Sequence, residues 1–536
     1  MSSSAAKPRL TSSSIATLCS AFVVWKLLLI AIACASPGPG YDTSTQLFFH
    51  TRPLPGAFDD HRQLPLLADW LVGKLTRWDA IYFTAIAHRG HVYEQEYAFG
   101  YNLHAIAQVF SLSDHPSPAA CALTGILVSH LFHLLSTLVL FLLALQIAPS
   151  QSYEGRRRIA LLTGLLHIFS PAGIFLSAPY SESMFAFWNF LGMLCFAWSC
   201  HPKPTGVEGG IDTLARRDLY ILISGLAFAL ASRIRSNGVF SSLVFAFDLA
   251  LAVPHLPQAL TSFVEVRRLS ALAIAGLVTA SGMVIPQALA WVEYCGSAIE
   301  KGRERRPWCD ARPPSIYAWV QKVYWNVGFL NYWVLSNLPL FLLAAPMLVL
   351  LTLTGLAPFF NPTILQIAPP DHPTKTHPAN TEAAPTLQPN NSSPSTKDEQ
   401  QQQQQRHVEN AYTSHCLRRL AIPQLILSLT ALTQSHVQIV NRLASGYPVW
   451  YLVLASAIAN ANDKANGGPV RPTRGALGSR DDNTTTTATV SQTSSALMRK
   501  LAGLPRSAKA LEWTFRAMVM YAVVQAGLFA SFMPPA

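Results

Sequence analysis

The sequence predicts an all-α protein that crosses a membrane many times. Half of the 536 residues are hydrophobic and only 12% are charged, whereas soluble domains carry about 25% charged residues. The apolar residues gather in runs close to the roughly 20 residues that a helix needs to cross a bilayer. The net charge is +11, but the basic residues stand mostly in short clusters between these runs. That pattern is typical of orientation signals in a membrane protein and argues against a nucleic-acid partner.

The apolar runs predict roughly nine to eleven membrane-spanning helices. The first run is interrupted by Lys26 and is too long for a signal peptide, so we expect it to be a retained span. The candidate spans are 14–35, 121–147, 158–178, 181–200, 218–232, 236–252, 269–292, 328–356, 416–435, 446–460 and 512–533.

Basic clusters predict the orientation. If the N-terminus is cytoplasmic, Arg156–Arg158, Arg216-Arg217, Arg267-Arg268 and the stretch 464–509 all face the cytoplasm, as the positive-inside rule requires. The loop 293–325 falls on the far side although it carries Lys301, Arg303, Arg305, Arg306 and Arg312. It therefore either breaks the orientation or marks a site that needs positive charge.

Two polar segments divide the chain. Residues 357–412 and 461–510 are rich in Pro, Thr, Asn and Gln, and we expect disordered cytoplasmic insertions there because they lack apolar residues. Around them we expect a membrane region at 1–356 with a first far-side loop at 36–120, a second membrane region at 413–460 and a last membrane helix at 511–536. The glycosylation sequons at Asn390, Asn391 and Asn483 should then stay unused.

The first far-side loop contains a predicted amphipathic helix on the membrane surface. Its apolar residues recur at helical spacing: Leu66, Leu67, Trp70, Leu71, Leu75, Trp78 and Ile81. Asp79 follows Trp78 and precedes Tyr82 and Phe83. A carboxylate among aromatic rings at a lipid interface is partly desolvated, which raises its basicity and suits a general base. The alternative is a surface Asp paired with Arg77 or Arg89.

Further polar groups are expected on the same face. Glu94 and Glu96 could supply a second acid, metal ligands or solvated loop charges. Three polar turns join apolar spans: 170–183 with Glu182, 232–238 with Arg233, Arg235 and Asn237, and 438–448 with Asn441 and Arg442. Arginine at membrane depth usually has a partner. That partner can be a phosphate, which guanidinium binds in a fork geometry, or a carboxylate such as Glu182 or Asp79. The remaining alternative is an arginine that only snorkels to the membrane interface. Several polar turns that converge on one face indicate a site.

Five motifs in order resemble a known family. They are RWDAIYF (77–83), SAPYSES (177–183), RSNG (235–238), YWNVGFL (324–330) and NRLASGYP (441–448). Together they resemble the second mannosyltransferases of glycosylphosphatidylinositol (GPI) anchor synthesis, from about residue 15 to the C-terminus. The resemblance implies a GT-C-type fold in the endoplasmic reticulum membrane, with the active site luminal. One departure is Gly100-Tyr101, where family members often carry an aromatic-Pro pair, so the shape of the loop after Phe99 is open.

The resemblance also implies the chemistry. The donor would be dolichyl-phosphate-mannose, the acceptor the GPI-precursor glycolipid and the product an alpha-1,6 bond formed with inversion. Asp79 matches the acidic residue of the first luminal loop and would be the base, while Arg235, helped by Arg233 or Arg442, would hold the leaving phosphate. We expect no metal or other cofactor, and a stabilising membrane subunit is possible. The expected substrate-binding residues are Trp78, Glu94, Glu96, Glu182, Arg233, Arg235, Asn237, Asn441 and Arg442.

The cysteines predict one disulfide. None of the eight forms a CxxC pair, which argues against a zinc site. Cys295 and Cys309 share the loop 293–325, which the orientation assigns to the oxidising lumen, and we expect a bridge between them. The alternative is two unpaired thiols on a flexible loop.

Other functions remain open from the sequence. A secondary transporter would also be polytopic, but transporters often show internal repeats and a midplane site. A lipid flippase or scaffold would not depend on Asp79. Another dolichyl-phosphate-sugar transferase differs only in its acceptor, which no residue identifies.

Overall fold

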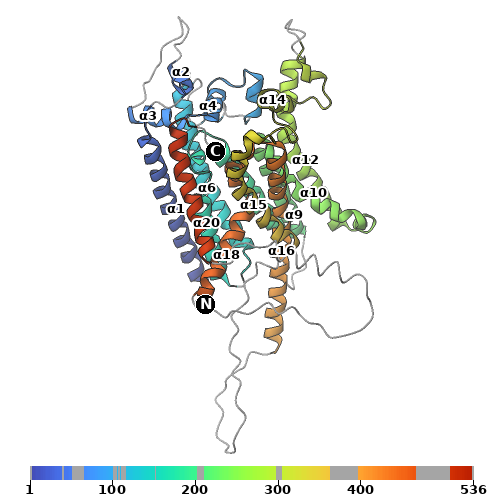
Figure 1. Cartoon of the computed structure of the whole chain (residues 1–536). Coiled ribbons are helices and arrows are strands. Elements are labelled where there is room, and N and C mark those ends of the chain that lie inside the picture. The colour runs from blue at the N-terminus through green and yellow to red at the C-terminus, as the bar shows by residue number, and fades with distance from the viewer. Residues whose placement is uncertain are drawn as a thin grey trace, which may run out of the picture.

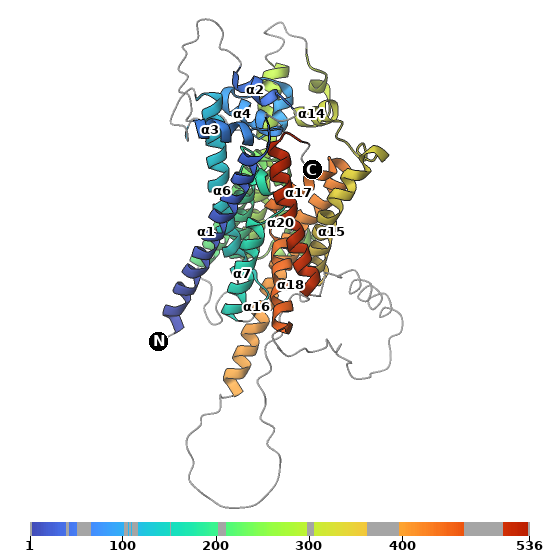
Figure 2. The same cartoon turned by 60° about the vertical axis from the view of Figure 1, so that its left-hand side comes forward.

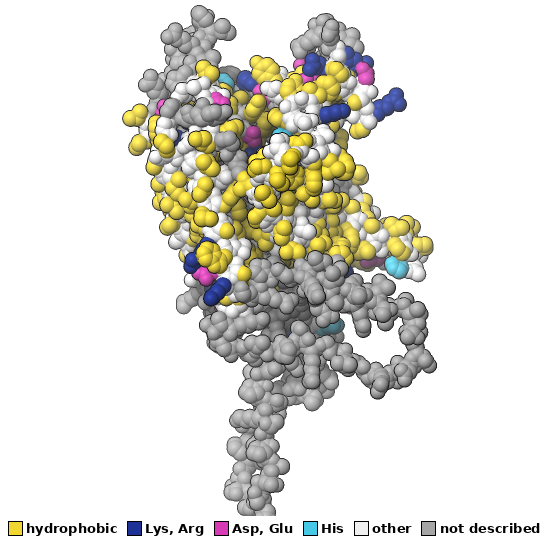
Figure 3. All heavy atoms as spheres, in the orientation of Figure 1, with side chains coloured by type: hydrophobic (Ala, Val, Ile, Leu, Met, Phe, Trp, Pro, Cys, Tyr) yellow, Lys and Arg dark blue, Asp and Glu magenta, His cyan; other side chains and the backbone are white. Residues whose placement is uncertain are grey.

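The computed structural model describes residues 3–38, 42–50, 66–100, 106, 109, 116–150, 152–201, 211–296, 305–361, 396–465 and 508–533. These residues are almost all helical and include no β-strand, so the all-α prediction is confirmed. Figures 1 and 2 show a bundle of long helices with several short helices gathered at one end. Hydrophobic side chains cover the sides of the bundle, whereas charged side chains gather toward its two ends (Figure 3).

Seven helical segments in the described part of the chain are long and apolar enough to cross a membrane. They are Ser12–Ala35, Pro118–Ile147, Ser236–Ala259, Phe263–Gly296, Leu335–Phe360, Gln403–Gln434 and Ala508–Ala530. Four further helices of the bundle are shorter or more polar: α7 (Tyr153–Ile168), α8 (Glu182–Ser199), α9 (Ile211–Ile234) and α18 (Val449–Ala465). The predicted nine to eleven spans counted these helices as well.

Successive helices run in alternating directions, which gives the bundle two chemically different ends. Helix α1 (Ser3–Ala35) starts at the end where the predicted cytoplasmic clusters Arg156–Arg158, Arg216-Arg217 and Arg267-Arg268 lie, which we call the basic end (Figure 1). The opposite end, which we call the site end, carries the short helices. They are α2 (Ser44–His50), α3 (Leu66–Leu75), α4 (Asp79–Arg89), η1 (Glu94–Ala98) and α14 (Ile316–Trp325).

Small residues allow the central helices to approach closely. Helix α9 packs against both α8 and α12 (Phe263–Trp291). A Cβ at Gly282 of α12 would lie 2.2 Å from the carbonyl oxygen of Ala229, and one at Gly225 would lie 2.7 Å from Ala275. Close contact between small residues is the usual way in which membrane helices associate, because lipid supplies no hydrophobic driving force between them. This packing fixes the end of α9, where Arg235 follows.

The predicted surface helix over 66–81 is two helices. Helix α3 ends at Leu75, the chain turns at Trp78 with a φ of 57°, and α4 begins at Asp79. The turn is held from the end of α1, because Lys74 Nζ donates to the carbonyl oxygens of Ser36 and Gly38 at 2.9 and 2.8 Å. Periodicity could not reveal this break, since its cause lies in a distant segment.

Two other predicted boundaries differ from the structure. The segment 357–412 was expected to be disordered throughout, but α16 (Thr396–Gln434) begins inside it. Gln, Lys, Glu and Arg have high helix propensity, and they extend the helix of the apolar span that follows them in the chain. The span predicted at 328–356 begins later, at Leu335, because Asn326 and Leu330 adopt positive φ and interrupt the helix. The sequons at Asn390, Asn391 and Asn483 and most of 461–510 lie outside the described residues.

Candidate functional site

A cavity of about 550 Å³ lies at the site end, where the predicted polar turns meet. The turns converge because α8 begins, α9 ends and α18 begins at this end of an alternating bundle. The polar residues of the lining include Asp79, Ser181, Arg235, Ser236, Asn237, Tyr317, Gln321, Thr430, Gln434, Ser435, His436 and Arg442. The apolar lining includes Phe83, Phe99, Val239, Phe240, Met283, Leu427, Ala431 and Leu443. One cavity therefore combines charged and apolar walls.

Three charged side chains of this lining form a row with a fourth that is buried. Arg442 Nη2 lies 2.7 Å from Asp79 Oδ2, and Arg442 Nε lies 3.4 Å from Glu182 Oε1. The same Glu182 oxygen lies 2.7 Å from Nη1 of Arg235. Both contacts of Glu182 are ion pairs without hydrogen-bond alignment, and this residue is only 1% exposed. The row balances two carboxylates against two guanidiniums, as buried charges require.

The loop that carries Glu182 is anchored by groups buried in the bundle. Lys26 Nζ of α1 donates to the carbonyl oxygen of Leu176 and to Ser177 Oγ, both at 2.8 Å. Ser129 Oγ of α6 (Pro118–Ile147) donates to the carbonyl oxygen of Ala178 at 2.8 Å. These bonds satisfy carbonyl oxygens at the end of the 3₁₀ helix η2 (Gly173–Leu176) and in the turn that follows it. The lysine that interrupts the first apolar run thus holds the loop in its shape.

Other predicted site residues lie around the cavity in different roles. Asn237 lines it, and its Nδ2 donates to the hydroxyl of Tyr447 at 3.1 Å. Asn441 does not line it; the Asn441 side chain is buried and donates to Tyr521 of α20 (Ala508–Ala530) at 2.9 Å. Trp78 packs on Phe532, with ring centroids 5.1 Å apart. Arg233 borders a smaller neighbouring cavity.

Glu94 and Glu96 lie beside the cavity and are held by protein partners. Arg306 binds both oxygens of Glu94 at 2.7 and 2.5 Å, and Trp308 Nε1 donates to it at 2.8 Å. Arg89 binds Glu96 through both carboxylate oxygens, at 2.6 and 3.1 Å. Burial alone would raise the pKa of each carboxyl, but these bonds outweigh it and lower both pKa values below the ordinary range. Neither residue lines the cavity, and both stabilise the 3₁₀ turn η1.

Cys295 and Cys309 are joined by a disulfide, with their Cα atoms 5.7 Å apart. The bridge brings Arg306 and Trp308 onto Glu94, so the basic loop packs against η1. The chain after η1 reaches the cavity at Gly100, where a Cβ would lie 2.5 Å from the carbonyl oxygen of Ile234. This close approach leaves no room for a side chain at position 100.

Several lining residues were missed by the sequence analysis. Helix α14 contributes Tyr317, Gln321 and Trp325, and the chain just after α16 contributes His436, whose ring stacks on Tyr332 with ring centroids 4.8 Å apart. Trp325 belongs to a motif that carried the family resemblance, but no role was assigned to it. Nothing in the sequence marks His436 as a site residue, because a polar residue at the end of an apolar span is also what an ordinary span boundary contains. Within the described residues, no group of three or more His, Cys, Asp or Glu could hold a metal ion.

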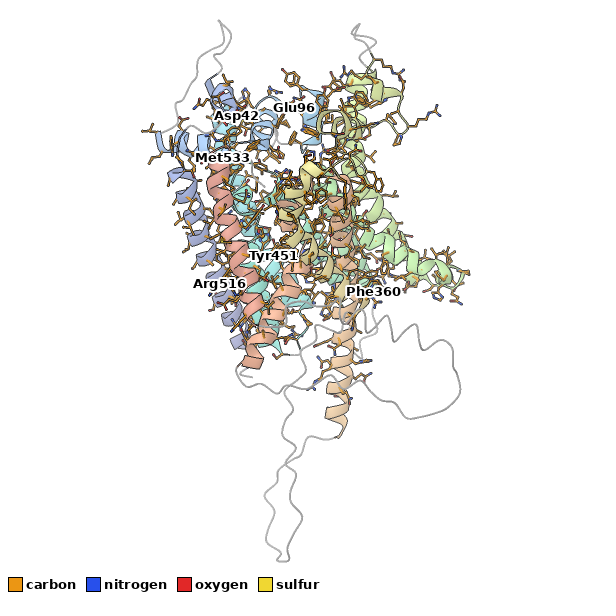
Figure 4. All side chains as sticks on the ribbon, in the orientation of Figure 1. Asp42, Glu96, Phe360, Tyr451, Arg516 and Met533 are labelled. Carbon is orange, nitrogen blue, oxygen red and sulfur yellow. A yellow bond between two sulfur atoms is a disulfide. The ribbon has the colours of Figure 1, made fainter. Side chains whose placement is uncertain are left out.

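Side chains at the two ends of the bundle lie far from each other along the helices. Figure 4 shows Glu96 and Met533 at the site end, Tyr451 within the bundle and Arg516 toward the basic end. The C-terminal helix α20 therefore runs from the basic end to the site end. Phe532 just after it contacts Trp78, next to the Asp79 carboxylate.

Comparisons with known proteins show the family of this chain. The family described as Mannosyltransferase (PIG-V) matches residues 61–536. Two proteins named GPI mannosyltransferase 2 are each 34% identical to this chain over 97% of its length, one from Chaetomium globosum (96% of that protein covered) and one from Gibberella zeae (98% covered). A protein of the same name from Aspergillus oryzae is 33% identical over 97% of this chain and 96% of its own length.

Among solved structures, an oligosaccharyltransferase of Archaeoglobus fulgidus aligns over 96% of this chain, with a TM-score of 0.37 and 12% identity. This chain spans 56% of the length of that protein. The family match and the fungal relatives cover nearly the whole sequence, and so the chain belongs to the PIG-V family of mannosyltransferases.

Proposed function

We propose that this mannosyltransferase transfers mannose from dolichyl-phosphate-mannose to a GPI precursor, as the second mannose in an alpha-1,6 bond. The relatives named GPI mannosyltransferase 2 support the acceptor. The observation that carries the donor is the composition of the 550 Å³ cavity, which is lined by Arg235 and Arg442 together with apolar residues such as Val239, Phe240 and Met283. A phosphate linked to both a sugar and a polyprenyl chain needs both kinds of wall.

Asp79 is the proposed general base. The hydroxyl oxygen of the acceptor attacks C1 of the donor mannose while the bond from C1 to the phosphate oxygen breaks, and Asp79 accepts the hydroxyl proton. The 35% exposure of the Asp79 side chain leaves it accessible from the cavity, and Arg442 fixes one of its oxygens. Attack on the face opposite the leaving phosphate inverts the configuration at C1.

Arg235 and Arg442 are proposed to bind the leaving phosphate. Guanidinium groups bind phosphate through two parallel hydrogen bonds, and Glu182 holds both guanidiniums at the cavity wall. The departing lipid phosphate gains negative charge as the bond breaks, so two guanidiniums held in place beside it stabilise the transition state more than the ground state. The active site would face the lumen of the endoplasmic reticulum, on the side opposite the basic clusters. That no cofactor is needed stays a prediction.

The direct test is Asp79→Asn, with Asp69→Asn as its matched control. Asp69 is an exposed residue of α3 outside the cavity, so its substitution removes the same charge from the same segment. Mannose transfer from labelled donor in microsomes should fall about 10²- to 10⁴-fold in Asp79→Asn, the usual contribution of a general base, and stay normal in Asp69→Asn. Near-normal transfer by stably inserted Asp79→Asn protein would refute the assignment of the base. The glycolipid that accumulates on depletion identifies the acceptor.

A further inference from the structure

A second pair of cavities lies at the basic end, away from the proposed active site. They measure about 420 and 550 Å³ and share Asp248, Arg268 and His415 in their walls. Arg217 borders the first and Arg419 the second. The lining residues come from α8, α9, α10 (Leu243–Ala252), α12 and α16 and from the short helix α11 (Leu256–Ala259). The proposed transfer reaction uses none of these residues.

The arginines of these cavities exceed the carboxylates that neutralise them. Asp248, only 5% exposed, accepts a hydrogen bond from Arg419 Nε at 2.5 Å and lies 3.9 Å from Arg268 Nη1. It therefore balances one of the two guanidiniums. Glu265, which lines the second cavity, accepts a hydrogen bond from Arg268 Nε at 2.9 Å. Asp218 is shared by Arg217 and Arg267. The four arginines at and beside these cavities thus exceed the three carboxylates that pair with them, which leaves a surplus positive charge.

An apolar arm borders the same cavities. It consists of the end of α10, the 3₁₀ turn η4 (Val253–His255) and the short helix α11 (Leu256–Ala259), and it projects sideways from the bundle at this level (Figure 1). Its exposed side chains are mostly hydrophobic (Figure 3): Leu251, Val253, Leu256, Leu260 and Phe263 are 40–70% exposed. Apolar side chains exposed beside a charged pocket at the end of a membrane bundle are expected where acyl chains meet lipid head groups.

We propose that these cavities bind the head group of an anionic phospholipid from the leaflet at the basic end. The phosphate would lie against Arg268 and Arg419, and Asp248 and His415 would meet hydroxyl groups of the head group. The acyl chains would follow the arm. A soluble anion would need the arginines equally but would gain nothing from the apolar arm, and so we favour a lipid.

The test measures lipid preference in the purified full-length protein. A photoactivatable phosphatidylinositol and a phosphatidylcholine with identical acyl chains compete for labelling, and the labelled peptides are identified by mass spectrometry. The wild type should prefer phosphatidylinositol, with labels on α10, α11 or α16. In Arg268→Gln the ratio of phosphatidylinositol to phosphatidylcholine labelling should fall about fivefold, the usual effect of one basic residue near an anionic surface. Arg516→Gln, an exposed arginine of α20 at the same end, should retain it.

The outcomes are distinct. Equal labelling by the two lipids in the wild type, or labels confined to other helices, would overturn the proposal without requiring any variant to fold. Unchanged preference in Arg268→Gln would overturn the role of the arginines. Competition by soluble glycerophosphoinositol as strong as by the intact lipid would show a site for free anions and refute the lipid assignment. Mannose transfer is not read in this experiment, so its result is independent of the proposed function.

Discussion

Glu182 offers the sharpest test of the charged row, because one buried carboxylate there serves two arginines. In Glu182→Gln the shape is kept, but Arg235 and Arg442 face each other without the charge that separates them. At charge separations near 4 Å and an effective dielectric constant of about 20, each lost attraction is about 4 kcal/mol before relaxation. Removal of one partner from a buried ion pair has a measured cost of about 3–5 kcal/mol. We expect destabilisation in that range.

The assay is the apparent unfolding temperature of the purified protein, followed by tryptophan fluorescence in the same detergent for all variants. Glu512→Gln is the matched control, because Glu512 pairs with Arg516 on α20 but both side chains are more than half exposed. Such a pair contributes about 0–1 kcal/mol, so the control should melt close to the wild type. The double variant Glu182→Gln with Arg235→Gln should recover part of the loss, since it no longer leaves that arginine unpaired. Equal melting of Glu182→Gln and Glu512→Gln would refute the reasoning.

Three further predictions concern the donor, the η1 turn and the disulfide. Arg235→Lys should weaken the apparent donor affinity in microsomes, because Lys lacks the bidentate fork; unchanged affinity would move the phosphate role to Arg442. Glu94→Gln should lower the free energy of unfolding at pH 7, because a carboxyl whose pKa is lowered in the folded state stabilises the fold above its unfolded pKa of about 4.3. The difference between wild type and variant should shrink as the pH falls below that value. A difference that stays constant with pH would contradict this reasoning. Non-reduced alkylated peptides should show Cys295 linked to Cys309, a bridge worth about 3 kcal/mol on the chain-entropy model, whereas two alkylated thiols would exclude it.

The helical architecture could be predicted because its signal is local. Apolar runs of membrane length need no partner to be recognised, and basic clusters label one side of the membrane. Alternating helices then bring Glu182, Arg235 and Arg442 to one end, and the structure has all three in one row with Asp79. The alternatives of Arg77 and Arg89 as partners of Asp79 were plausible from spacing alone. Arg442 lies 363 residues away, and spacing cannot reveal such a contact.

Roles that depend on distant contacts could not be predicted. Glu94 and Glu96 read as candidates for substrate binding, but their partners Arg306 and Arg89 satisfy them within the protein. Asn441 read as a site residue, whereas its side chain joins the C-terminal helix. Gln321 and His436 gave no signal, because the sequence does not show which face of α14 meets the end of α16. A polar residue in a turn indicates that something binds it and leaves open whether that is the protein or a ligand.

Before substrates bind, the two carboxylates and two guanidiniums of the charged row carry no net charge, and the proposed reaction benefits from this balance. The donor phosphodiester brings one negative charge, and the leaving lipid phosphate carries about two. Asp79 loses its charge when it accepts the acceptor proton, so one unit of negative charge moves from Asp79 to the phosphate while the total stays constant. Arg442 contacts Asp79 before the transfer and lines the same cavity as Arg235. Its guanidinium can therefore pair first with the Asp79 carboxylate and then with the leaving phosphate. Glu182 keeps both arginines in place throughout. A site at the membrane boundary can therefore run this step without creating net charge in a medium that solvates charge poorly.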